Sequence, residues 1–317
     1  MPYGNSSEVG ICFQDSYGTS NINSMHWIPI VDEDIALEKP NLVSQSMTGL
    51  YDEGQNYEGP NVINGTLNCE AHPIASGAIM KAMFGDPTTV ASGTPTVYRH
   101  TFKPRTDEFD GKSANVPFTM YKAFDDPGSA TLLYDLNGGS FELSINNGEL
   151  LMHKLGVVGG KFSQVAQIAA SFPTGKQWTW DQTSMSLDGT ATDLISSLTV
   201  TVEEPIESKH TLNNSVYPSR NKRTGFRMIN ISGTLTFDDQ TEYQEFLAQT
   251  ERKLVTTFKG EGVNFFEMTI PLFRHTDFKP VIGGPGEIEI SFTSKGVYSV
   301  GSGTAIEFVL VNTKAGY

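Results

Sequence analysis

Residues 141–146 read Phe141-Glu142-Leu143-Ser144-Ile145-Asn146, in which apolar and polar side chains alternate one by one. The same alternation returns over residues 198–203 and over residues 287–293. Successive side chains of a strand point to opposite faces of its sheet, so a period of two predicts strands with one buried and one polar face. Turn signals such as Asn137-Gly138-Gly139 separate these stretches. The pattern predicts an all-β chain with minor α content.

Only two segments have the apolar spacing of helices. The first covers about residues 73–84, with Pro73 in its first turn and Gly85 after its last. The second covers about residues 241–254. It is expected to bury Tyr243, Phe246, Leu247 and Leu254.

The two helices reveal an internal repeat. Gly65-Thr66-Leu67 precedes the first helix, and Gly233-Thr234-Leu235 precedes the second. The offset that superimposes these triplets also superimposes Ala78-Ile79 on Phe246-Leu247, so the two helix faces coincide. We therefore expect two tandem β domains, which are residues 1–162 and residues 163–317.

The charge balance limits the classes of partner. The 317 residues include 22 Lys and Arg against 36 Asp and Glu, a formal charge of −14. Proteins that bind nucleic acid present basic surfaces to the phosphates, so this balance excludes a simple nucleic-acid binder. The one basic cluster is Arg220, Lys222, Arg223 and Arg227. A loop that meets an acidic surface of a neighbouring copy explains this cluster at least as well as a nucleic-acid patch does.

No pattern of catalytic or metal-binding residues stands out. The six histidines have no partner at metal-ligand spacing, and no Gly-x-Ser-x-Gly sequence occurs. We expect no enzymatic activity, no metal and no cofactor. Cys12 and Cys69 are expected to be free, buried thiols. With neither a secretion signal nor a membrane span in the sequence, we expect folding in a reducing cytoplasm.

The order of motifs in the first half resembles a known family. The run Gly10-Ile11-Cys12-Phe13-Gln14-Asp15-Ser16-Tyr17-Gly18-Thr19 opens the chain, followed by Trp27-Ile28-Pro29-Ile30. The Gly65-Thr66-Leu67 strand, the first helix and Tyr98-Arg99-His100-Thr101-Phe102 come next. Over residues 8–160 this order is similar to that of phage tail tube proteins, and the second half resembles the family by layout.

The resemblance implies β-sandwich domains, each with a flanking helix, in rings that stack head to tail into a hollow phage tail tube. Inner strands of neighbouring copies would join into one barrel. Genome DNA would pass through the tube at ejection without specific binding, and an acidic lumen suits that passage. The implied protein is part of the virion and assembles in the host bacterial cytoplasm, away from membranes. Its implied partners are the tape-measure, tail terminator and baseplate or distal tail proteins.

The repeat sharpens these expectations. If one domain fills a sixth of a ring, three copies of a two-domain chain close a trimeric ring with pseudo-sixfold symmetry. Residues 44–60 and 205–227, with Arg220, Lys222, Arg223 and Arg227, are expected to reach the next ring. The polar sides of the alternating strands face either the lumen or the ordinary outer surface. The residues expected in the lumen are Glu142, Ser144, Asn146, Glu287, Glu289 and Ser291.

A second function stays open at this point. A carbohydrate- or receptor-binding β-sandwich of a virion would stack its tryptophans on sugars. The available residues are Trp27, Trp178 and Trp180. A hydrolase on a β scaffold has no supporting set of residues.

Overall fold

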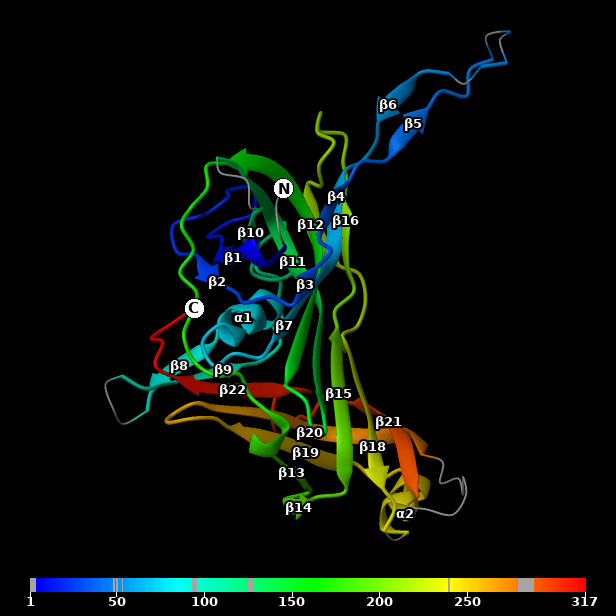
Figure 1. The fold of residues 1–317 in the computed structure, drawn as a ribbon. Coiled ribbons are helices and arrows are strands. Elements are labelled where there is room, and N and C mark those ends of the chain that lie inside the picture. Colours follow the sequence, from blue (N-terminus) through cyan, green and yellow to red (C-terminus); the bar gives the residue numbers. More distant parts are fainter. Residues whose placement is uncertain are drawn as a thin grey trace.

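The computed structural model describes residues 4–47, 49, 51–52, 54–92, 96–124, 128–238, 240–278 and 288–317. Over these residues the chain is mostly β with two short α-helices, which confirms the expected fold class. Long strands run together through the middle of the molecule, and a second group of strands crosses their lower ends (Figure 1).

The elements fall into two series along the chain. The first half contributes β1 (Glu8–Phe13), β2 (His26–Trp27), β3 (Asp32–Glu33), β4 (Ala36–Glu38), β5 (Asn41–Val43), β6 (Asn56–Glu58), β7 (Val62–Glu70), α1 (Ser76–Phe84), β8 (Thr88–Ala91), β9 (Tyr98–Phe102), β10 (Phe118–Ala123), β11 (Ala130–Asn146) and β12 (Met152–Val165). The second half contributes β13 (Thr183–Leu187), β14 (Thr190–Thr192), β15 (Ile195–Glu203), β16 (Ile206–Lys209), β17 (Arg220–Arg223), β18 (Met228–Thr236), α2 (Thr241–Ala248), β19 (Arg252–Lys259), β20 (Phe265–Phe278), β21 (Glu289–Gly296) and β22 (Glu307–Asn312).

Both expected helices form, but the second is shorter than predicted. It ends at Ala248, because Gln249 takes the left-handed conformation with φ of 53°. From Arg252 the chain alternates buried and exposed residues as strand β19, so Leu254 is buried in a sheet rather than on a helix. Leu247, expected in the core, is exposed. The prediction for residues 249–254 was wrong because a short period-two stretch was read as the end of a helical one.

The strand order of the first half returns in the second. The first half pairs its strands in the order β2, β1, β10, β11, β12, β7 and then β3 with β4. The second half pairs its strands in the order β14, β13, β19, β20, β21, β18 and β15. Every pair is antiparallel, and each half places its α-helix directly after β7 or β18 in the chain.

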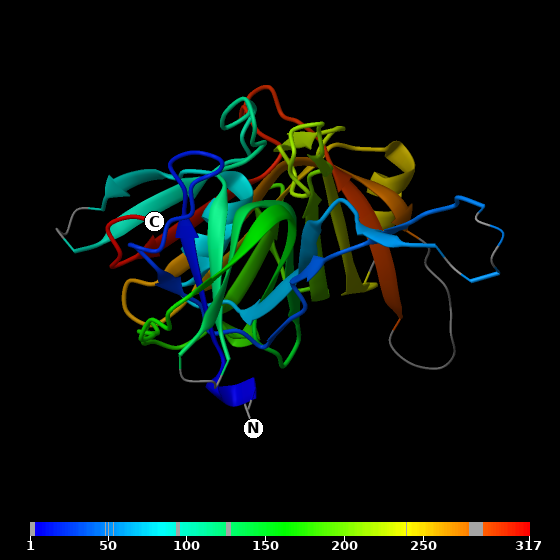
Figure 2. The same cartoon turned by 90° about the horizontal axis from the view of Figure 1, so that it is seen from above.

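A two-stranded arm interrupts each half at the same place. The first arm, β5 with β6, lies in the chain between β4 and β7. The second arm, β16 with β17, lies between β15 and β18. Seen from above, the first arm projects beyond the rest of the chain (Figure 2).

Strand pairing also joins the two halves. The C-terminal part of β11, from Ser140 to Asn146, pairs with Glu203 to Ser197 of β15. At the lower end, β22 lies between β20 of its own half and β9 of the first half. A single antiparallel sheet therefore continues from one half into the other.

One apolar core runs through both halves. Phe84 of α1 packs against Phe141 of β11 and Phe308 of β22, with ring centres 5.4 and 5.0 Å apart. Phe308 also contacts Phe266 of β20. All nine residues of α1 are buried, and its Gly77 lies so close to the Tyr317 ring that a Cβ would be 2.1 Å from it. Cys12 and Cys69 are both free and buried, as predicted.

His153 of β12 gives this core a pH response. Its ring lies between Phe141 and Phe266, with centres 5.2 and 5.9 Å away, and neither ring nitrogen has a hydrogen-bond partner among the described residues. Burial lowers the pKa of His153 from 6.5 to about 3. Below pH 6.5 the unfolded chain therefore binds a proton that the folded chain does not, and stability falls as the pH falls.

We predict that His153→Phe removes this response while keeping a ring in the cavity. Between about pH 7 and about pH 5.5, the wild type should lose about 1 kcal/mol more unfolding free energy than the variant does. Urea unfolding of the isolated chain at both pH values measures the difference. Equal losses in the two proteins would contradict the assignment.

Candidate functional site

The polar side chains of β11 lie in register with those of the strands on either side. Glu142 lies opposite Lys154 of β12 and opposite Thr201 of β15. Two residues further on, Ser144 lies opposite Thr199 of β15. Directly opposed residues of an antiparallel pair project from the same face. The strands β12, β11 and β15 therefore present one common surface.

That surface continues through both halves of the chain. On one side, Lys154 lies opposite Asn68 of β7, whose amide donates a hydrogen bond to Asp32 of β3. On the other side, Thr201 lies opposite Asn230 of β18, and Asn230 lies opposite Lys295 of β21. We call this surface the polar face. Its polar members include Asp32, Asp34, Glu38, Asn64, Thr66, Asn68, Glu70, Lys154, Ser140, Glu142, Ser144, Asn146, Ser197, Thr199, Thr201, Glu203, Asn230, Ser232, Thr234, Thr236, Glu289, Ser291, Thr293, Lys295 and Arg274.

The opposite side of the same strands is apolar and buried. Leu143, Val200 and Ile231 lie opposite one another in β11, β15 and β18, and none is more than 1% exposed. A shift of register by one residue would move this set to the solvent side. Burial of the apolar side thus fixes which residues form the polar face.

The structure brings together most of the residues predicted for a lumen. Glu142, Ser144, Asn146, Glu289 and Ser291 lie on the polar face, although they come from different halves. Glu287 lies outside the described residues. The alternation in the sequence was enough to find these strands. It missed Asp32 and Asp34, because β3 and β4 are too short to show a period.

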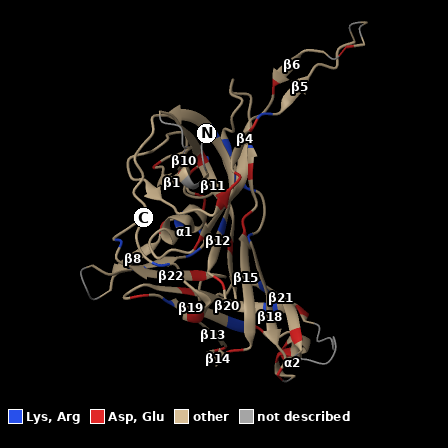
Figure 3. Cartoon of the chain, in the orientation of Figure 1, with Lys and Arg blue, Asp and Glu red and all other residues tan. Residues whose placement is uncertain are grey.

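Carboxylates outnumber ammonium groups on the polar face. Its acidic members are Asp32, Asp34, Glu38, Glu70, Glu142, Glu203 and Glu289, and its described basic members are Lys154, Lys295 and Arg274, which lies opposite Lys295 in β20. The backbone N–H and hydroxyl of Thr66 donate to Asp34 and, with Lys154 nearby, lower the pKa of that carboxyl, which keeps it ionised. Figure 3 shows red and blue segments scattered over both halves, with long uncharged stretches on the central strands.

The chemistry of the polar face is that of a surface rather than of a catalytic centre. Its members offer hydroxyl, amide and carboxylate groups, and none of the polar members named above is a histidine, a cysteine or an aromatic residue. Within the described ranges, no group of three His, Cys, Asp or Glu residues is placed to hold a metal ion. None of the described helices has the length and apolar character needed to span a membrane.

The basic cluster of the second arm has acidic partners within its own chain. Arg223 and Arg227 both pair with Glu204, whose side chain is 1% exposed. Burial lowers the pKa of Arg227, and Glu204 opposes that shift. Lys222 pairs with Glu108 of the first half. These three side chains thus hold the second arm against the rest of its own chain. The expected contact of the cluster with a neighbouring ring stays a prediction.

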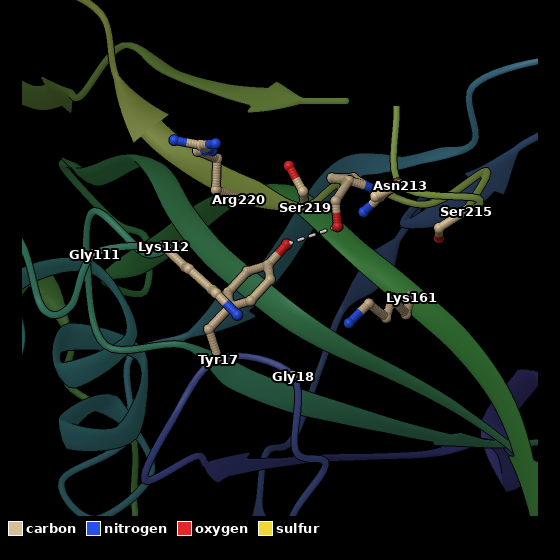
Figure 4. Close-up of a pocket in the computed structure, with 10 residues that line it drawn as sticks. Tyr17, Gly18, Gly111, Lys112, Lys161, Asn213, Ser215, Ser219 and Arg220 are labelled. Carbon is tan, nitrogen blue, oxygen red and sulfur yellow. Dashed lines mark hydrogen bonds between the residues drawn. The ribbon is translucent and has the colours of Figure 1, made fainter. Parts of the chain in front are cut away.

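Arg220, the remaining member of the cluster, lines a pocket of about 510 Å³ between the second arm and the first half (Figure 4). The Tyr17 hydroxyl donates to the carbonyl of Pro218 at 3.2 Å. Lys161 on the opposite wall pairs with the buried Asp135 at 2.8 Å. Burial raises the pKa of Tyr17, so its phenol stays protonated. The named groups hold the arm in place and include no activated nucleophile.

The tryptophans do not form a sugar platform. Trp27 is 8% exposed and Trp178 is fully buried, and only Trp180 of the three is half exposed. Trp178 lies in the core beside Phe266. Sugar binding by a flat surface needs exposed rings, so this arrangement gives the carbohydrate-binding alternative no support.

Comparison with known proteins identifies one family. A family model described as phage tail tube protein matches residues 4–296. The matched region contains the whole polar face, both arms and both helices, and β22 follows it. No curated protein matches the sequence.

Glu204 provides a test of how the second arm is held. We predict that Glu204→Gln lowers the free energy of unfolding by about 3 kcal/mol, because it leaves two largely buried guanidinium groups without their carboxylate. Urea unfolding measures this loss. The matched control is Glu207→Gln, which breaks an exposed pair with Lys209 and should cost about 0.5 kcal/mol or less. Equal effects of the two changes would show that the arm does not depend on Glu204.

Proposed function

This chain belongs to the phage tail tube protein family, and from that premise we propose that it is the subunit of a hollow tail tube through which genome DNA leaves the virion. The observation that carries this proposal is the pairing of β11 with β15, which continues the sheet of one repeat into the next. A tube needs the same junction between chains that this structure has within one chain.

The two ends of the sheet are suited to that junction. In the first half, β11 pairs with β12 on one edge and, in its C-terminal part, with β15 on the other. In the second half, the C-terminal part of β20 pairs with β21 on one edge, and none of the described strands pairs with the other edge of that part of β20. By the repeated strand order, the counterpart of β15 is β3 with β4, at the opposite end of the sheet. Pairing of β20 with β4 of the next chain would close a ring and leave neither of these two edges open.

The repeat sets the number of chains that we propose for the ring. Residues 1–162 and 163–317 act as two tube domains, so three chains supply the six domains of a pseudo-sixfold ring. Rings then stack head to tail, because a heterologous contact between successive rings, unlike the contact within a ring, does not close and builds an open filament. The chain is structural and needs no cofactor. It assembles in the host cytoplasm and adjoins the tape-measure, terminator and baseplate or distal tail proteins at the ends or interior of the tube.

We assign the polar face to the lumen. Ring closure through β20 and β4 extends this face around the whole ring, with the apolar side towards the core. Excess carboxylates repel phosphate, and short hydroxyl and amide side chains offer DNA no aromatic ring on which to stack. DNA would therefore pass without specific binding.

Native mass spectrometry of short assembled tubes tests the stoichiometry. We predict that dissociation releases rings of three chains, because each chain carries two repeats. Electron microscopy of the same rings should show six similar lobes. Rings of six chains would contradict the proposal that each repeat fills one sixth of the circumference.

A charge change on the polar face tests the lumen assignment. We predict that Glu142→Lys with Glu289→Lys leaves tubes intact but slows DNA release from virions, because lysines in the lumen attract phosphate. The control, Asp107→Lys with Glu261→Lys, makes the same change in net charge at exposed carboxylates away from the polar face. Release rates that are the same for both variants would argue against this assignment.

A further inference from the structure

The two arms hold matching places in the two repeats, but among the described residues the second arm alone packs across a repeat of its own chain. Asn221 of the second arm is fully buried. Its amide donates to the carbonyl of Asp135 at 2.8 Å, and its N–H donates to the carbonyl of Lys112 at 2.7 Å. Both acceptors belong to the first repeat. The second arm therefore lies across the repeat that precedes its own.

The first arm projects away from both repeats (Figures 1 and 2). Four large apolar side chains of this arm, counting the loop that joins β5 to β6, are exposed: Leu42 by 56%, Tyr57 by 57%, Met47 by 101% and Tyr51 by 109%. So many exposed apolar residues on one short hairpin mark a protein interaction surface. Three of the four, Met47, Tyr51 and Tyr57, are of residue types that are enriched at protein interfaces.

The second arm shows what the outer end of such an arm contacts. Its connecting loop meets Asn61, which lies in the junction between the first arm and β7. The N–H of Asn61 donates to the carbonyl of Val216 at 2.7 Å, and the Asn61 carbonyl lies 2.9 Å from Nε2 of His210. In the second repeat, the corresponding junction between the second arm and β18 contains Phe226, which is 96% exposed.

We propose that the first arm of each chain lies across the second repeat of the neighbouring chain in the same ring, with its apolar side chains against Phe226. This arrangement repeats between chains the contact that the second arm makes within one chain. It covers the exposed apolar residues of the first arm and the exposed phenylalanine together. The inference rests on the proposed ring. It places the first arm within a ring, whereas the sequence led us to expect residues 44–60 to reach the next ring.

Cross-linking between single thiols tests whether the first arm of one chain contacts Phe226 of a neighbouring chain. Met47→Cys and Phe226→Cys each add one exposed thiol, while burial raises the pKa of Cys12 and Cys69 and keeps both unreactive. Assembled tubes are treated with a short bismaleimide and then denatured for gel electrophoresis. Tubes made from a mixture of the two single variants should give dimers, and tubes of either variant alone should give monomers.

The double variant Met47→Cys with Phe226→Cys distinguishes a contact within a ring from a contact between rings. Links within a ring close after three chains, so the proposal predicts trimers as the largest covalent product. Links between rings continue along the tube and would give a ladder beyond trimers, which would overturn the proposal, as would tubes with no cross-link. A matched double variant, Val90→Cys with Phe226→Cys, pairs the same phenylalanine position with an exposed valine of β8 and should stay monomeric.

Ring formation without cross-linking provides a second measurement. Leu42→Ser with Tyr57→Ser should raise the protein concentration needed for ring assembly at least about tenfold, which corresponds to about 1.4 kcal/mol per contact. Leu212→Ser, which changes a still more exposed apolar residue on the loop of the second arm, should leave this concentration unchanged. Equal effects would count against the proposal. If the wild type forms neither rings nor tubes, the proposed function itself fails, and the inference fails with it.

Discussion

The structure depends on one strand pairing, that of β11 with β15 over Ser140 to Asn146. A sheet edge with free N–H and C=O groups must be paired, covered or made unattractive to other strands. In this chain the edge of the first repeat is paired by the second, so the two repeats form one sheet with one core beneath it. In the ring that we propose, the edges of β20 and β4 pair in the same way with other copies. The stability of the subunit and its assembly would then rest on the same kind of interaction.

The polar face follows from that pairing. Because β11 and β15 are in register, their polar residues continue one surface, and burial of Leu143 and Val200 on the other side prevents a shift of register. The acidic excess on this surface comes from both repeats. No single side chain performs the function that we propose. The relevant property is a continuous polar surface on which carboxylates outnumber basic groups and no named polar member is aromatic.

Much of the polar face could be predicted from the sequence, since alternation of period two is a local property. Glu142, Ser144, Asn146, Glu289 and Ser291 were found in this way, and the structure places them on one face. The short strands β3 and β4 gave no signal, because two or three residues cannot show a period. The end of α2 was misplaced for a related reason: apolar residues of β19 fit the helical spacing as well.

The ion-pair partners of the basic cluster could not be predicted from local sequence. Arg223 and Arg227 were expected to meet another copy, yet both pair with the buried Glu204 of the same chain. That carboxylate is indistinguishable in sequence from its neighbours, the half-buried Glu203 and the exposed Glu207. A cryo-EM reconstruction of the assembled tube tests the central claim most directly. The account predicts that the C-terminal part of β20 pairs with β4 of the next chain and that the polar face lines the lumen. A β4 edge left in solvent, or a polar face on the outside of the tube, would contradict it.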